Sequence, residues 1–145
     1  LNALREVRRD KFLPSNLSSL SYSEAELLIQ NDRKVMNPWL LAKMIQSLDL
    51  STTDNVLSLA TGYGYSCALI SSLANFVVTV ESGEFALEAQ SRLIENGYDN
   101  ILVKEGNTIK MIEVKSKSWE YGESFRDEKG FISSRWQKYL YDVAF

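Results

Sequence analysis

Two closely spaced glycines and a distant carboxylate are the residues of this chain most able to do chemistry together. The apolar run Val56–Leu59 breaks at Gly62 and Gly64 before apolar residues resume at 68–70, which predicts a strand, a tight turn and a helix start. Such a turn directs backbone N–H groups and a positive helix end toward the carboxyl edge of a parallel sheet. A second strand-like run ends in Glu81, about 20 residues after Ala60, the offset at which an acidic side chain accepts hydrogen bonds from ribose hydroxyls.

The glycine spacing narrows the choice of ligand. A dinucleotide fingerprint would place its third glycine at position 65, which is Tyr65. In the pattern G-x-G-x-G, typical of methyltransferases, Ala60 takes the first position and Gly62 and Gly64 the others. The loop therefore predicts a cradle for S-adenosylmethionine, and the alternative is a glycine turn that only packs a strand on a helix.

The composition is that of one globular domain and excludes several enzyme classes. The chain has 145 residues, 45% of them hydrophobic, and no histidine. A Ser-His-Asp or Cys-His apparatus is therefore impossible in its usual form, and a zinc site would need carboxylates and one thiol, so we expect no metal. The net charge of -3 argues against nonspecific binding to nucleic acid. No run suits a bilayer and no signal peptide pattern is present, which predicts a cytoplasmic protein.

One cysteine and one basic cluster are interpreted mainly as structural features. Cys67 lies among apolar residues and is expected to be a small core residue with an inert thiol. A basic cluster interleaved with Glu6 and Asp10 is interpreted as a solvated helix face, and contact with an acidic partner is the alternative. Its members are Arg5, Arg8, Arg9 and Lys11.

The order of elements predicts an α/β fold with a doubly wound, Rossmann-like sheet. A helix over Leu1–Arg9 is expected to stop before Pro14, and Ser15–Leu20 to form a short helical turn. Asn37 and Pro38 predict a capped helix start, followed by an apolar stripe that we assign to core packing: Leu41, Met44, Ile45 and Leu48. Strand and helix then alternate: strand, loop and helix over Asn55–Leu73, a strand over Phe76–Glu81, a helix over about Glu84–Asn96 ended by Gly97, and a strand over Ile101–Lys104.

The pattern changes after Gly106, where β structure with turns is expected and no further helix. We therefore divide a single domain, 1–145, into an N-terminal helical substrate-side region (1–50), a cofactor-binding half (51–111) and closing β strands (112–145).

Several segments, in the correct order, together resemble the protein-L-isoaspartate O-methyltransferase family. They are Arg5–Pro14, Ser21–Ser23, Pro38–Met44, the glycine loop, Val80–Glu81 and Asn100–Asn107, while Gly130–Ser133 and Tyr141–Phe145 are similar to the closing strands of a divergent bacterial branch. The resemblance implies a class I methyltransferase that acts on isoaspartyl carboxylates in damaged proteins, with a protein or peptide as its partner. It also implies that S-adenosylmethionine lies over the loop, with the ribose on Glu81 and the adenine edge near Gly106 and Asn107. The cofactor-binding candidates are Ala60, Thr61, Gly62, Tyr63, Gly64, Glu81, Ser82, Gly106 and Asn107, and the substrate-loop candidates are Met36, Asn37 and Pro38.

Four positions depart from the family's pattern. Ser58 replaces an acidic residue, Ala60 replaces the first glycine and Asn107 replaces an aspartate. Met36 stands where the family has a serine near the target carboxyl group. Three interpretations therefore stay open: an isoaspartyl methyltransferase, a methyltransferase of the same fold with another acceptor, and a module that binds cofactor or partner without catalysis.

The resemblance also implies that the chain is shorter than the family's fold requires between Gly106 and Glu113. The resemblance implies a further strand, helix and strand there, without which the third strand, Ile101–Lys104, would leave an unpaired apolar edge. Either a stretch is omitted from the sequence or the chain carries an internal deletion, and we favour the omission.

Overall fold

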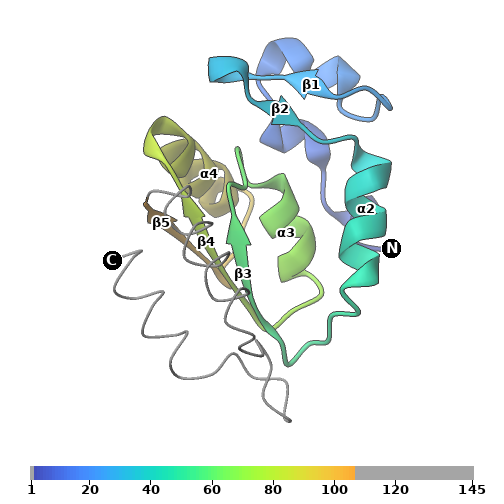
Figure 1. Ribbon diagram of the computed structural model, residues 1–145, viewed down its shortest axis with the longest axis vertical. Helices are drawn as coiled ribbons and strands as arrows, with labels where there is room; N and C mark the ends of the chain where they lie inside the picture. Colours follow the sequence, from blue (N-terminus) through green and yellow to red (C-terminus); the bar gives the residue numbers. More distant parts are fainter. Residues whose placement is uncertain (1, 107–145) are drawn as a thin grey trace, which may run out of the picture.

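The computed structural model describes residues 2–106, and a three-stranded parallel sheet is their centre. Its strands are β3 (Asn55–Leu59), β4 (Phe76–Glu81) and β5 (Ile101–Glu105), in the spatial order β3-β4-β5 (Figure 1). Helix α3 (Tyr65–Ser71) joins the first two strands and α4 (Gly83–Glu95) joins the second two. The predicted alternation is confirmed to within one or two residues for the strands and α4. The carboxyl ends of all three strands therefore meet at one edge of the sheet.

The helices and the sheet share one buried cluster. Leu69 of α3, Val77 of β4 and Leu93 of α4 belong to it and are almost fully buried. Cys67 also lies there with no exposed surface, so its predicted role in the core is confirmed. These contacts place α3 and α4 on the same face of the sheet, as right-handed crossovers between neighbouring parallel strands require.

Both outer strands of the described sheet are less buried than β4. The predicted strand over Val56–Leu59 is confirmed as part of β3, and its residues are half-buried. Within residues 2–106, β3 and β5 each pair with β4 alone. Asn107, the predicted gap between Gly106 and Glu113 and the closing strands of 112–145 lie outside the described residues.

The first third of the chain forms short elements, of which residues 27–35 lie above the carboxyl edge of the sheet and residues 38–47 stand beside α3 (Figure 1). The order is α1 (Ala3–Glu6), the 3-10 helices η1 (Arg9–Phe12) and η2 (Ser15–Leu20), β1 (Leu27–Leu28), the 3-10 helix η3 (Gln30–Asp32), β2 (Lys34–Val35) and α2 (Pro38–Ser47). The prediction at Ser15–Leu20 is confirmed. The helix expected over Leu1–Arg9 forms only over Ala3–Glu6, because Val7 is already extended and ends α1 well before Pro14. The antiparallel β1–β2 hairpin was not predicted.

Arg9 corrects the interpretation of the basic cluster. Its side chain has no exposed surface, whereas Arg8 is exposed and pairs with Asp10 at 2.7 Å. The Arg9 guanidinium donates to the carbonyl groups of Ser21 and Met36, the latter at 2.9 Å. Since these acceptors come from distant turns, burial of this one arginine depends on how the turns pack, which a local charge pattern does not record.

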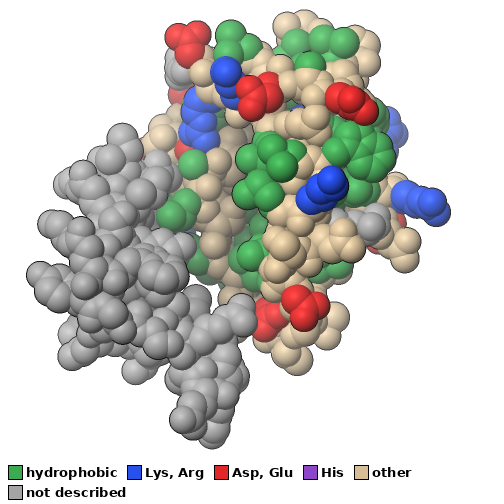
Figure 2. Space-filling view, turned by 45° about the vertical axis from the view of Figure 1, so that its right-hand side comes forward, with side chains coloured by type: hydrophobic (Ala, Val, Ile, Leu, Met, Phe, Trp, Pro, Cys, Tyr) green, Lys and Arg blue, Asp and Glu red, His purple; other side chains and the backbone are tan. Residues whose placement is uncertain are grey.

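Helix α2 begins as predicted but is less buried than its apolar stripe suggests. The Asn37 Oδ1 atom accepts from the backbone N–H groups of Trp39 at 2.8 Å and Leu40 at 3.3 Å, and Pro38 fills the first helical position. Ile45 is buried, but Met44 and Leu48 are about half exposed, so their assignment to the core was wrong. Figure 2, turned toward this side of the molecule, shows hydrophobic side chains gathered on the surface. None of the helices within residues 2–106 has both the length and the apolar character needed to cross a membrane.

Candidate functional site

The glycine loop follows β3 at the carboxyl edge, as predicted. Ala60 still bonds to the sheet, its N–H donating to the Val80 carbonyl at 3.0 Å. Three loop residues then have positive φ: Ala60 (57°), Gly62 (66°) and Gly64 (103°). This conformation costs a residue with a Cβ atom roughly 1–2 kcal/mol, so the chain needs glycine at the two later positions and tolerates strain at Ala60.

The two glycines have different surroundings. A Cβ atom on Gly64 would lie 3.2 Å from Leu93 Cγ, so this glycine lets the start of α3 approach α4. A Cβ atom on Gly62 would meet nothing nearer than Ile29 Cδ1 at 4.0 Å. Close packing against α4 therefore explains the glycine at position 64. Gly62, in contrast, has open space beside it and presents its backbone to that space.

Glu81 closes the site from β4 and is fully buried. Its Oε2 atom accepts from Gly62 N at 2.8 Å, and its Oε1 atom accepts from Ser82 N at 2.8 Å. Burial by itself would raise the pKa of Glu81, but the hydrogen bonds from Arg33, Ser82 and Gly62 outweigh it and lower this pKa below its usual value. The structure thus joins the predicted loop and the predicted carboxylate through one direct hydrogen bond.

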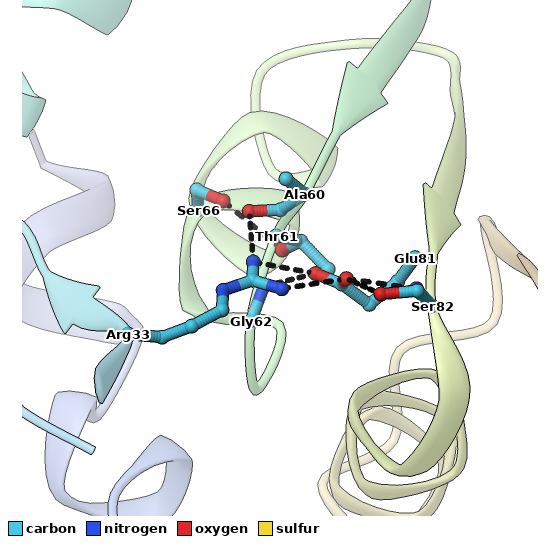
Figure 3. Close-up of polar contacts among 7 residues, drawn as sticks. All are labelled: Arg33, Ala60, Thr61, Gly62, Ser66, Glu81 and Ser82. Atoms are coloured by element: carbon cyan, nitrogen blue, oxygen red, sulfur yellow. Dashed lines mark hydrogen bonds and ion pairs between the residues drawn. The ribbon is translucent and has the colours of Figure 1, made fainter. Parts of the chain in front are cut away.

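Arg33 is the part of the site that the sequence did not reveal. It lies between η3 and β2, and its guanidinium donates to both oxygens of the Glu81 carboxylate, from Nη1 to Oε1 at 2.8 Å and from Nη2 to Oε2 at 2.9 Å (Figure 3). Nη2 also donates to the Ala60 carbonyl at 3.0 Å, and the guanidinium lies 4.5 Å from the centre of the Phe85 ring. The available signal was indirect: a carboxylate at the end of a buried strand needs a cation, but the charge pattern does not say which one.

The structure also shows the positions of those other predicted cofactor-binding residues that lie within the described part of the chain. Ser82 precedes α4 and contacts Glu81, and the hydroxyl of Thr61 lies 3.0 Å from that of Ser66 (Figure 3). The Tyr63 ring is buried, 5.5 Å from the Phe85 ring, so its side chain packs within the fold. Gly106 donates its N–H to the Glu81 carbonyl at 3.0 Å and so lies at the same edge of the sheet, next to Glu81.

The substrate-loop candidates connect β2 to α2. Met36 is 36% exposed, and its carbonyl is held by Arg9. Both polar atoms of the Asn37 side chain are engaged, Oδ1 as the helix cap and Nδ2 in a bond to the Glu24 carbonyl. Pro38 is buried in the first turn of α2. Asn37 and Pro38 therefore act structurally here, and Met36 is the candidate with the most accessible side chain.

Comparisons with known proteins show which family the chain belongs to. A sequence model of the protein-L-isoaspartate(D-aspartate) O-methyltransferase family matches residues 1–116. The chain belongs to this family. The expected family resemblance is thereby confirmed, and so is the methyltransferase-like α/β fold.

Two bacterial relatives illustrate how much of each chain the match covers. The protein-L-isoaspartate O-methyltransferase 2 of Pelobacter propionicus is 36% identical over 108 residues, which cover 74% of this chain and 48% of the relative. The protein-L-isoaspartate O-methyltransferase of Petrotoga mobilis is 34% identical over 111 residues, covering 76% and 52%. A solved protein-L-isoaspartate O-methyltransferase structure aligns with a TM-score of 0.59 at 24% identity, over 70% of this chain and 35% of that one. The chain therefore spans about half the length of the curated relatives it matches.

Proposed function

We propose that this chain binds S-adenosylmethionine at the loop Ala60–Gly64 and methylates isoaspartyl carboxylates in damaged proteins. The observation that carries the proposal is the hydrogen bond from Gly62 N to the Glu81 carboxylate at the carboxyl edge of a parallel sheet. It joins an open, positive-φ loop to an acceptor for ribose hydroxyls, which is the arrangement that nucleotide-like ligands use in doubly wound folds. Membership of the isoaspartyl methyltransferase family supports the choice of reaction.

The residues present fit such a cofactor. Gly62 leaves room beside its backbone, and Glu81 and Gly106 lie at the same edge of the sheet. Glu81 would hold the ribose, Gly106 would lie near the adenine edge, and the loop backbone would face the rest of the molecule. When bound, S-adenosylmethionine supplies a methyl group on a positively charged sulfur.

The proposed chemistry needs no histidine. A carboxylate with an ordinary pKa of about 4 is already ionised at neutral pH, so methylation of its oxygen would need no general base and no proton transfer. The protein would then have to align the target carboxylate with the methyl group and exclude water, and the turns above the carboxyl edge of the sheet would serve this purpose.

Met36 favours a second candidate, a methyltransferase of the same fold with a different acceptor. A thioether cannot donate a hydrogen bond to a carboxylate, and the Asn37 side chain is committed to the helix cap. We therefore expect isoaspartyl peptides to be methylated slowly compared with a relative that carries the serine. Robust turnover would show that the serine is dispensable. The third interpretation, binding without catalysis, rests on Ser58, Ala60 and Asn107.

Two measurements test the proposal in order. Calorimetric titration with S-adenosylhomocysteine determines whether the chain binds the cofactor at all, with Glu81→Ala and Gly62→Val as site variants. Glu81→Ala is expected to lose roughly 1.5–3 kcal/mol of binding free energy, the usual worth of hydrogen bonds to a charged acceptor. Transfer of a labelled methyl group to an isoaspartyl peptide then tests the acceptor. Unchanged affinity in both variants would refute the assignment of the site.

A further inference from the structure

The Glu81 carboxylate is already saturated by donors from the protein. Arg33 contributes two hydrogen bonds, and Gly62 N and Ser82 N contribute one each, all between 2.8 and 2.9 Å. A carboxylate offers about four lone-pair positions, so no acceptor site remains for a ribose diol. The acceptor that the proposed function needs is thus occupied in the protein as it stands (Figure 3).

Of the three residues that donate to Glu81, Arg33 is the one that reaches it through a long, partly exposed side chain. Gly62 and Ser82 donate from the backbone, where the loop and the start of α4 hold them in place, and the Ser82 hydroxyl adds a longer contact of 3.4 Å to the same carboxylate. The Arg33 side chain is 28% exposed and reaches the site from the short β1–β2 hairpin, so it can turn toward water. Its remaining bond, to the Ala60 carbonyl, is itself exposed.

We propose that Arg33 competes with the ribose hydroxyls of the ligand for Glu81, so that the ligand binds only when Arg33 moves away. This inference rests on the proposed function, because it takes a nucleoside as the ligand. The two hydrogen bonds from Arg33 satisfy the buried carboxylate, and the Phe85 ring supports the guanidinium from one side. Arg33 therefore stabilises the arrangement in which Glu81 is blocked, and the apparent affinity equals the intrinsic affinity multiplied by the fraction of molecules in which Arg33 has moved away.

The test is calorimetric titration of S-adenosylhomocysteine into the full chain and its variants. Arg33→Met keeps a side chain of similar length without donors, and it is expected to bind about 5- to 30-fold more tightly, the range that one or two kcal/mol of competition would produce. Lys34→Met is the matched control, because it removes the same charge from the next residue, whose side chain is 64% exposed and pairs with Glu26 at 3.3 Å. The control is expected to bind like the original protein.

A second pair of probes ties the effect to the diol. Adenosine is expected to gain affinity for Arg33→Met, whereas 2′,3′-dideoxyadenosine, which lacks both hydroxyls, is expected to gain none. Arg33→Lys keeps the positive charge but loses the paired N–H donors of the guanidinium. It should therefore bind adenosine more tightly than the original protein and less tightly than Arg33→Met. This variant also serves if Arg33→Met fails to fold, which circular dichroism would reveal.

The outcomes separate this inference from the function on which it rests. If the original protein binds and folded Arg33 variants bind equally or more weakly, the competition is refuted and the cofactor site stands. An equal gain for the ligand without the diol also refutes competition for Glu81. If no variant binds S-adenosylhomocysteine or adenosine, the proposed cofactor and this inference are both refuted.

Discussion

Replacing Glu81 with glutamine tests the centre of the site without any ligand. The four atoms closest to the carboxylate are all donors: Arg33 Nη1 and Ser82 N on one oxygen, Arg33 Nη2 and Gly62 N on the other. In either orientation, the new amide NH2 group would face two donors. One guanidinium N–H and one backbone N–H would therefore lose their acceptor.

The magnitude follows from the burial of those donors. Leaving one buried backbone N–H unpaired costs about 1–3 kcal/mol. The loss of charge at the partner of Arg33 adds a smaller amount, because the Arg33 side chain is 28% exposed and can regain water. We expect Glu81→Gln to lower the free energy of unfolding by about 2–4 kcal/mol, a large share of the stability of an ordinary domain.

Urea denaturation followed by circular dichroism measures this loss. Glu105→Gln is the matched control: Glu105 pairs with Glu81 in the strand register, at the end of the neighbouring strand, but its side chain is exposed. It is expected to change the unfolding free energy by no more than about 0.5 kcal/mol. A Glu81→Gln protein within that same margin would refute the reasoning, because the carboxylate would then not be holding the loop, the helix start and the hairpin together.

Further predictions concern pH and local geometry. Since the folded-state pKa of Glu81 lies below the usual pKa of a glutamate, the stability that Glu81 contributes is complete above that usual pKa and is lost as pH falls through the folded pKa. Urea midpoints between pH 6 and 3 should fall more steeply for the original protein than for Glu81→Gln, and parallel curves would contradict this. Gly64→Ala should lower the melting temperature more than Gly97→Ala, because both have positive φ but only the first meets Leu93; equal losses would mean that backbone strain alone matters. Asn37→Ala should cost about 0.5–2 kcal/mol of unfolding free energy through loss of the helix cap, and an unchanged urea midpoint would show that Pro38 is sufficient to start α2.

Local patterns were sufficient to predict the elements that carry the loop. Val56–Leu59 and Phe76–Glu81 form strands because short β-branched and apolar runs suit a pleated sheet, and α2 starts at Asn37 because its side chain can satisfy the first free N–H groups. These preferences act over a few residues and are legible in one sequence. The α2 stripe failed at Met44 and Leu48 because periodicity reports which residues share a face, not whether anything covers that face.

The sequence by itself determined that a tight glycine turn and a carboxylate would meet at one edge of a parallel sheet, because glycine placement and the alternation of strand and helix follow from local patterns. Only the tertiary structure decided which other charged side chains lie near this edge and which partners they have. Arg33 and Glu81 lie 48 positions apart, and Arg9 is buried by carbonyl groups from two separate turns. A charged side chain finds such partners only once the hairpin and turns have docked on the sheet. The cost of burying charge without a partner then determines which arginines remain on the surface and which close the site.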